Sequence, residues 1–419
     1  MTDETPVGAG ASRTDGSSDD TTELETTDGI GRRVERLGKK RQYAVLGGLT
    51  ALAIAVFGVG LVLSGSDDSP PPPKPDIPLD AWAPYWTLDA SLVDAPTRIP
   101  SMREISPFWY NATGVDAITL DPNADAAAAE EFIDIARGTG ADLVPSIVDA
   151  MPAGEMAAIL ADPVTRSRHV DAIIAFADDG DYDGIDLDYE QFAFADGSDT
   201  WAATRPNWVA FVRELGEALD DDGRTLTVSI PPVYDSERTG TSGFWVYDHG
   251  AIAPYVDRIR VMAYDYSVGE PGPIAPLDFV TRSVEGVLEA VGDPDKVVLG
   301  LASYGRNWPV SVSGDCPAGE EIPGMTSVNN RTIDDLLERR GATPTFDPVA
   351  GESSFTYDLE ITDGTTTCVQ SRVVHYVGAQ GVRLRMDLAR GYQLDGVALW
   401  AFGFDDPAVW EQILPTVSS

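Results

Sequence analysis

The feature that most constrains the fold of this chain is a repeated alternation of short apolar runs with longer amphipathic segments. In the longer segments apolar residues recur at three- and four-residue spacing, which predicts helices. Examples are residues 123–140, 162–180, 205–223 and 276–292. The short apolar runs predict eight strands, at residues 80–86, 103–110, 141–148, 182–190, 224–230, 257–265, 296–305 and 395–403.

Regular alternation of strands and helices predicts an α/β fold with a parallel sheet. Eight such units that close on themselves form a (β/α)8 TIM barrel, which is the fold class we expect. A doubly wound open sheet is the alternative, because alternation alone does not show closure. In the first of the helical segments, Asn123 is a candidate N-cap and Gly138 a candidate helix stop.

Three compositional blocks precede the first strand. Residues 1–42 begin with a polar, acidic stretch that has too few apolar side chains to fold and end in a basic cluster, so we expect a disordered cytoplasmic segment. Residues 43–65 are uncharged, apolar and long enough to cross ~30 Å of hydrocarbon as a helix. The proline-rich residues 66–78 predict an extended linker, and residues 79–419 predict the barrel.

The charges on either side of residues 43–65 predict the orientation of this transmembrane helix. Arg and Lys precede it and Asp follows it, so the positive-inside bias places the N-terminus in the cytoplasm and the barrel outside the cell. The expected localisation is therefore the cell membrane, crossed once. A cleaved signal peptide is the alternative, disfavoured by the long polar segment before the apolar run and by the lack of an A-x-A-like site after it.

The spacing of the elements breaks once, between the seventh and eighth strands. Residues of about 309–374 include TPTFDPVAGESSFTYD, a pattern typical of antiparallel strands joined by turns, and predict a small α+β insertion on the barrel rim. Both cysteines of the chain, Cys316 and Cys368, lie in this insertion. In a compartment outside the membrane we expect them to form a disulfide; two free buried thiols are the alternative.

Charge and composition limit the partners that this chain can bind. It has 29 Lys and Arg against 68 Asp and Glu, a formal net charge of −39, so its surface should repel nucleic acid. The three histidines are scattered and no C-x-x-C spacing occurs, so we expect neither a Cys or His metal site nor a cofactor.

The fourth predicted strand alternates acidic and apolar side chains. Asp186, Asp188 and Glu190 share one face, while Ile185 and Leu187 point the other way, toward the helices. In a barrel the acidic face is the interior, and it rises toward the carboxyl ends of the strands, where the chemistry of this fold is found.

Confined like charges cannot all stay ionised, so at least one of these carboxyl groups should keep its proton and act as a general acid. The alternatives are a strand end that binds a divalent cation and one that simply faces water.

The stretch DGIDLDYE resembles the D-x-x-D-x-D-x-E signature of glycoside hydrolase family 18, the chitinase and endo-N-acetylglucosaminidase family. Asp183, Asp186, Asp188 and Glu190 occupy its four acidic positions. Three further stretches resemble the family in the same order. They are VMAYDY with Met262, Tyr264 and Asp265, GLASYGRNW with Tyr304, Arg306 and Trp308, and GVALWAFGFDD with Trp400.

The resemblance implies substrate-assisted hydrolysis, in which the 2-acetamido oxygen of the sugar attacks its own anomeric carbon. Glu190 would protonate the leaving oxygen and later deprotonate water. Asp188 would hold the acetamido N–H and stabilise the cationic intermediate, while Asp186 would share its proton and charge. Tyr264 would orient the acetamido carbonyl group.

The remaining site residues are expected to bind sugar or to support the strand. Asp265 and Met262 belong to the motif on the sixth strand, and Asp265 would contact the distorted sugar. Trp400 would form the floor of the sugar site. Tyr85, like other aromatic residues near strand ends, could stack on a pyranose ring or close the barrel core. Asp183 would support the strand through backbone hydrogen bonds.

Within the family the resemblance is closest to the bacterial branch that includes spore-cortex and cell-wall lysins, because of EISPFWYNATG on the second strand. One departure is clear: the third strand normally ends in S-x-G-G, but VPSIVDA has Ser146 without the glycines.

We expect a glycosidase that cleaves β-1,4 bonds next to N-acetylglucosamine in a polysaccharide or oligosaccharide, whether chitin, peptidoglycan or a glycoprotein glycan. A non-catalytic sugar-binding barrel and a cation-binding surface scaffold are the alternatives.

Overall fold

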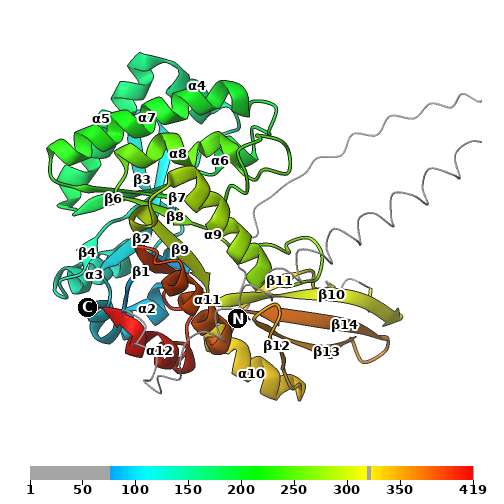
Figure 1. The fold of residues 1–419 in the computed structure, drawn as a ribbon. Helices are drawn as coiled ribbons and strands as arrows, with labels where there is room; N and C mark the ends of the chain where they lie inside the picture. The colour runs from blue at the N-terminus through cyan, green and yellow to red at the C-terminus, as the bar shows by residue number, and fades with distance from the viewer. Residues whose placement is uncertain (1–75, 319–321, 419) are drawn as a thin grey trace, which may run out of the picture. The chain divides into compact units, whose positions relative to one another are not determined.

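The computed structural model describes residues 76–318 and 322–418, in which eight parallel strands close into a barrel (Figure 1). In chain order these strands are β1 (Ile77–Pro84), β2 (Glu104–Gly114), β5 (Ser146–Asp149), β6 (Gly184–Asp188), β7 (Thr225–Ile230), β8 (Arg258–Val261), β9 (Val297–Ala302) and β15 (Gly396–Trp400). The first strand pairs in parallel with both β2 and β15, so the sheet has no open edge at this point. Closure confirms the TIM barrel and excludes the doubly wound sheet.

Helices follow the strands and surround them in Figure 1. The longer ones are α2 (Leu88–Arg98), α3 (Ala126–Arg137), α5 (Pro163–Gly180), α7 (Trp201–Asp221), α9 (Leu277–Val291) and α11 (Ala379–Gly391). The shorter ones are α4 (Glu155–Ala161), α6 (Gln191–Phe194), α8 (His249–Ile252) and α12 (Pro407–Ile413). In α7, the side chains of Trp208, Phe211, Leu215 and Leu219 are fully buried, so one face of this helix packs toward the barrel.

The N-cap of α3 differs from the prediction. The carboxylate of Asp125 accepts hydrogen bonds from the backbone N–H groups of Ala127 and Ala128 at 3.0 and 3.1 Å. Asn123 does not cap the helix, because its side chain donates to Asp121 instead. The helix ends at Gly138, as predicted. Two acceptors within three residues competed for one helix start, and the carboxylate provides the better acceptor for the positive end of a helix.

The apolar layer between the strands and the helices contains Ile185 and Leu187 of β6, both fully buried. The acidic residues that alternate with them therefore face the interior of the barrel, as the strand periodicity predicts. Three short strands extend the main sheet: β3 (Ala117–Leu120) and β4 (Asp142–Leu143), which both pair with β2, and β16 (Val417–Ser418), which pairs with β1.

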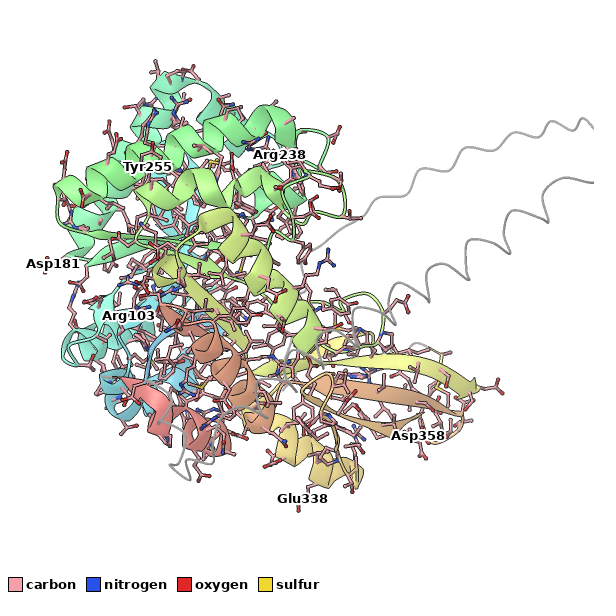
Figure 2. The ribbon with its side chains drawn as sticks, in the orientation of Figure 1. Arg103, Asp181, Arg238, Tyr255, Glu338 and Asp358 are labelled. Carbon is pink, nitrogen blue, oxygen red and sulfur yellow. A yellow bond between two sulfur atoms is a disulfide. The ribbon has the colours of Figure 1, made fainter. Side chains whose placement is uncertain are left out.

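The insertion between β9 and β15 is a second, five-stranded antiparallel sheet with one helix. Its elements are β10 (Tyr304–Gly314), β11 (Thr326–Asn329), α10 (Asn330–Arg340), β12 (Thr345–Asp347), β13 (Glu352–Thr362) and β14 (Thr367–Tyr376). Glu338 on α10 and Asp358 on β13 mark it in Figure 2. The insertion starts directly after β9 and is therefore longer than the predicted 309–374.

Two features hold the insertion. A disulfide joins Cys316 to Cys368, whose Cα atoms are 4.6 Å apart. The buried carboxylate of Glu352 accepts the backbone N–H groups of Ile274 and Ala275 at 2.8 and 2.6 Å and pairs with Arg385 at 3.3 Å. These contacts tie β13 of the insertion to the segment between β8 and α9.

The expected localisation at the cell membrane is corrected by the structure. Among residues 76–318 and 322–418, no helix combines the length and the apolar character that a membrane crossing requires. The expected transmembrane helix at 43–65, the segment at 1–42 and nearly all of the linker at 66–78 lie outside the described residues.

Candidate active site

The carboxyl end of β6 brings three carboxyl groups to the mouth of the barrel. Asp186 is fully buried and Asp188 is 5% exposed. Glu190 follows the strand as the residue that precedes α6, and its side chain is partly buried. The three predicted acidic residues therefore lie together at the end of the barrel where this fold places its chemistry.

Asp186 is fixed by four neighbours from four other strands. Its Oδ2 accepts from Trp82 Nε1 at 3.0 Å and from Ser146 Oγ at 2.5 Å. Its Oδ1 accepts from Ser229 Oγ at 2.6 Å, and Arg260 Nη1 lies 3.4 Å from Oδ2. Because donors surround both oxygens, Asp186 is held as a rigid acceptor beneath Asp188.

Asp188 and Glu190 form a hydrogen bond between their carboxyl groups, which requires a shared proton. Burial, followed by the charges of Glu190 and Asp186, raises the pKa of Asp188 well above its ordinary value. Burial also raises the pKa of Glu190 to about 7. Near neutral pH the pair therefore holds at least one proton at the barrel mouth.

Two polar atoms, one in this pair and one beside it, have no hydrogen-bond partner among the described residues. They are Oδ1 of Asp188, an acceptor, and the hydroxyl group of Tyr264, a donor; both atoms are buried. Burial raises the pKa of Tyr264 well above its ordinary value, so its hydroxyl group keeps its proton. Leaving buried polar atoms unpaired costs free energy. A ligand that offers a donor to Asp188 Oδ1 and an acceptor to the Tyr264 hydroxyl group would remove this cost.

A cavity of about 530 Å³ opens beside Glu190, and we call it the Glu190 cavity. It is lined by Glu190, Phe194, Pro231, Pro232, Tyr234, Phe244, Met262, Tyr264, Asp265, Tyr266, Val268, Phe279 and Arg282. The structure therefore brings together four predicted site residues, Glu190, Met262, Tyr264 and Asp265. Several of the other lining residues are aromatic and can stack on sugar rings.

Asp265 is oriented by two residues of the insertion. Its Oδ1 accepts hydrogen bonds from the hydroxyl group of Tyr304 and from Arg306 Nη2, the latter at 2.7 Å. Its backbone has a φ of +58°, a conformation that non-glycine residues adopt infrequently. Because β10 begins directly after β9, the insertion fixes one wall of the Glu190 cavity.

Trp400 and Tyr85 lie apart from the lining of the Glu190 cavity. The ring of Trp400 packs against Trp82, Trp86 and Phe108, with centroids 5.7, 6.1 and 5.0 Å away. Tyr85 contacts the ring of Trp86 at 4.9 Å. Since Trp82 also donates to Asp186, this aromatic group reaches the acidic strand from the side of β1 and β15.

Asp183 lies outside the site. Its exposed carboxylate accepts the backbone N–H of Leu143 at 2.8 Å, and its own N–H donates to the carbonyl of the same residue at 3.1 Å. These bonds join the start of β6 to β4. In the part of the chain that the structure describes, no group of three or more His, Cys, Asp or Glu side chains is placed to hold a metal ion.

Comparison with known proteins decides the family. The model of glycosyl hydrolases family 18 matches residues 116–405. The chain belongs to glycoside hydrolase family 18.

Among similar proteins, the uncharacterized glycosylase YvbX of Bacillus subtilis is 24% identical over 265 residues, which cover 62% of this chain and 69% of YvbX. The probable chitinase 2 of Drosophila melanogaster is 27% identical over 271 residues, 59% of this chain and 52% of that protein, so the match spans only about half of it. The crystal structure of the Bacillus cereus spore cortex-lytic enzyme SleL has the same fold, with a TM-score of 0.68. The two chains are 18% identical, and the match covers 83% of this chain and 76% of that chain.

Asp149 is a site residue that sequence reasoning missed, and it stands where the family 18 pattern on this strand has its last glycine. Its buried carboxylate accepts the backbone N–H groups of Glu190, Gln191 and Phe192 at 2.7, 2.9 and 2.9 Å. Burial raises the pKa of Asp149 to about 6, although these three hydrogen bonds act in the opposite direction. Asp149 therefore holds the backbone of Glu190 and adds a negative charge beside it at neutral pH.

Arg260 is the second residue that the sequence pattern did not reveal as part of the site. It is fully buried inside the barrel, where it pairs with Glu104, Asp80 and Asp186 and donates to Ser106 Oγ at 2.7 Å. The available signal was the spacing of Arg258 and Arg260, which places both on the interior face of β8 in this family 18 barrel.

Proposed function

We propose that this chain hydrolyses β-1,4 bonds next to N-acetylglucosamine by substrate-assisted catalysis with retention of configuration. The observation that carries the proposal is the unpaired Oδ1 of Asp188 and the unpaired hydroxyl group of Tyr264 beside the protonated pair. An N-acetyl group offers one N–H donor and one carbonyl acceptor. It therefore complements these two atoms, which an unsubstituted sugar hydroxyl group does not do as well.

In the proposed reaction Glu190 donates its proton to the leaving glycosidic oxygen. The acetamido oxygen attacks the anomeric carbon, so that the C–O bond to the leaving sugar breaks as the oxazolinium ring closes. Water, deprotonated by Glu190, then opens the ring at the same carbon and restores the proton balance. Two inversions at one carbon return the β configuration.

The other residues support this sequence through charge and orientation. Tyr264 would donate to the acetamido oxygen and aim it at the anomeric carbon. Asp188 would accept the acetamido N–H and balance the positive charge of the intermediate, which forms in a site shielded from water. Asp186, fixed by its donors, supplies a second negative charge near Asp188. Trp400 and Tyr85 remain proposed sugar contacts on the side of β1.

The proposal specifies the bond that is cleaved, but it specifies the polymer only as one that contains N-acetylglucosamine. YvbX is described as a glycosylase, the Drosophila relative as a probable chitinase and SleL as a spore cortex-lytic enzyme, and each of these descriptions is compatible with a polymer that contains N-acetylglucosamine. No cofactor takes part in the proposed reaction, because the substrate supplies the nucleophile.

The stereochemistry of the first product tests the mechanism. We expect proton NMR of freshly formed product to show the β anomer before mutarotation. A thiazoline analogue of N-acetylglucosamine should inhibit, because it resembles the cyclic intermediate. Release of the α anomer first, or equal cleavage of a substrate without the 2-acetamido group, would contradict the proposal and favour a mechanism with a carboxylate nucleophile.

The pH dependence tests the role of Asp149. Glu190 must be protonated to act as an acid and its pKa lies at about 7, so kcat/KM should fall as the pH rises through this value. Asp149→Asn removes a negative charge that helps to raise the pKa of Glu190, so the alkaline limb should move to lower pH. Asparagine keeps an acceptor oxygen for the N–H groups of Glu190 and Gln191.

The pH profile separates this electrostatic effect from simple loss of structure. Asp171→Asn on the exposed face of α5 is the matched control and should leave the limb in place. If Asp149→Asn lowers the maximum of kcat/KM but leaves the pH of its alkaline decline unchanged, Asp149 acts on the fold alone.

A further inference from the structure

One basic side chain lines the Glu190 cavity, that of Arg282 on α9. Its guanidinium lies over the ring of Tyr234, with Cζ 4.1 Å from the ring centroid, and Nη2 donates to the carbonyl of Thr241 at 3.2 Å. These contacts hold the side chain against the wall while most of its donors stay free.

No carboxylate forms an ion pair with Arg282 among the residues that the structure describes. One acidic group whose charge interacts with Arg282 is the partly exposed Asp235, whose pKa is lowered by hydrogen bonds from Ser242 and Glu237 and, more weakly, by the charge of Arg282. The carboxylate of Asp235 is therefore engaged by its own loop.

The acidic groups of the cavity are also engaged. Asp265 pairs with Arg306, and Glu190 bonds with Asp188 and shares a proton with it. Arg282 therefore presents to the cavity a guanidinium that forms no direct ion pair among the described residues, although the whole chain carries a formal net charge of −39.

The wall around Arg282 is aromatic. Tyr266 packs against Phe279 with centroids 5.1 Å apart, and Tyr234 packs against the same ring at 6.1 Å. Tyr266 is 58% exposed and Phe194, which lines the same cavity, is 49% exposed. Flat apolar faces beside a fixed guanidinium suit a sugar ring whose substituent carries an anion.

We propose that Arg282 binds a carboxylate on the sugar next to the cleaved bond, so that the substrate is an acidic N-acetylglucosamine polymer rather than neutral chitin. The lactyl ether of N-acetylmuramic acid carries such a carboxylate. The planar guanidinium can hold both oxygens of this group at once. A neutral chain offers only hydroxyl and amide oxygens at this position. The inference rests on the proposed function, because it assigns the sugar that enters the Glu190 cavity.

The experiment measures binding to the full-length Glu190→Gln protein, which does not consume the ligand. The ligands for calorimetry are a tetrasaccharide of alternating N-acetylglucosamine and N-acetylmuramic acid, the same tetrasaccharide with its carboxyl groups amidated, and chitotetraose. We expect the free carboxylate to bind about tenfold more tightly than the amide. This advantage should shrink as salt is added. Equal affinity for the acid and the amide would overturn the proposal.

Variants of Arg282 test whether this residue is the group that binds the carboxylate of the ligand. Arg282→Met keeps an apolar side chain against Tyr234 and should reduce the tenfold advantage to about twofold or less. Arg282→Lys should keep part of it, because lysine retains the charge but not the planar fork. Arg213→Met removes an equal charge from an exposed position on α7 and should retain the full advantage. A full advantage in Arg282→Met would overturn the assignment.

Turnover by the unmodified chain separates the two proposals. Cleavage of chitotetraose with no carboxylate advantage in binding would leave the proposed function standing and reject the role of Arg282. A carboxylate advantage that depends on Arg282, with none of the three ligands cleaved, would support the binding site and reject the hydrolase.

Discussion

Glu190→Gln is expected to lower kcat by about 10²- to 10⁴-fold or more on any oligosaccharide that the unmodified chain cleaves. Glutamine keeps the shape of the side chain and can still hydrogen-bond with Asp188, but it has no titratable proton to give to the leaving oxygen. The measurement is the steady-state rate of release of reducing ends. Because the pKa of Glu190 is about 7, the comparison is best made near pH 6, where most of the unmodified chains are protonated.

Two controls keep this result specific to the chemistry. The variant should melt at nearly the same temperature as the unmodified chain and should still bind the oligosaccharide. Glu217→Gln makes the same change on the exposed face of α7 and should leave kcat unchanged. A loss of less than tenfold in Glu190→Gln would contradict the assignment of this residue as the general acid.

Arg260→Met is expected to lower the free energy of unfolding by about 3–5 kcal/mol. The guanidinium is buried with the carboxylates of Glu104, Asp80 and Asp186, and its removal leaves these acidic groups without their shared counter-charge. Urea unfolding followed by circular dichroism measures the change. Arg213→Met on the surface is the control and should stay within about 0.5 kcal/mol.

The loss should depend on pH with a definite sign. Burial raises the pKa of Glu104 to about 7 even though Arg260 lowers it, so removing Arg260 raises this pKa further. A carboxyl group whose pKa is higher in the folded than in the unfolded state binds more protons when folded, so stability falls as the pH rises. The deficit of Arg260→Met should therefore be larger at pH 8 than at pH 5. A deficit below 1 kcal/mol, or one that grows toward acid, would contradict this account of the buried network.

Much of the fold could be predicted because it depends on local periodicity. Each of the eight predicted strands overlaps a barrel strand, since burial on both faces of a parallel sheet requires short apolar runs. Errors occurred where two local signals compete. Asp125 and Asn123 are both good caps, and the insertion begins without a break after β9, so its start carries no turn signal.

The membrane localisation failed for a different reason. It rested on residues 43–65 alone, and the described residues contain no helix that could cross a bilayer. The barrel prediction rested on many segments that must agree with one another.

Sequence alone determined that Asp186 and Asp188 lie on one interior face just before Glu190, because the side chains of a strand alternate strictly. Only the tertiary structure decided which groups meet them. Trp82 lies 104 residues from Asp186, and Ser229 lies 43 residues away, yet both donate to its carboxylate.

The tertiary structure also placed Asp149 beneath the backbone of Glu190, and it placed Arg282 on the wall of the Glu190 cavity. A pKa and an unpaired donor are properties of an environment, set by burial and by charges that the fold brings near. Local sequence can place an acid on a strand, but its protonation at neutral pH depends on residues that are distant in the chain and adjacent in space.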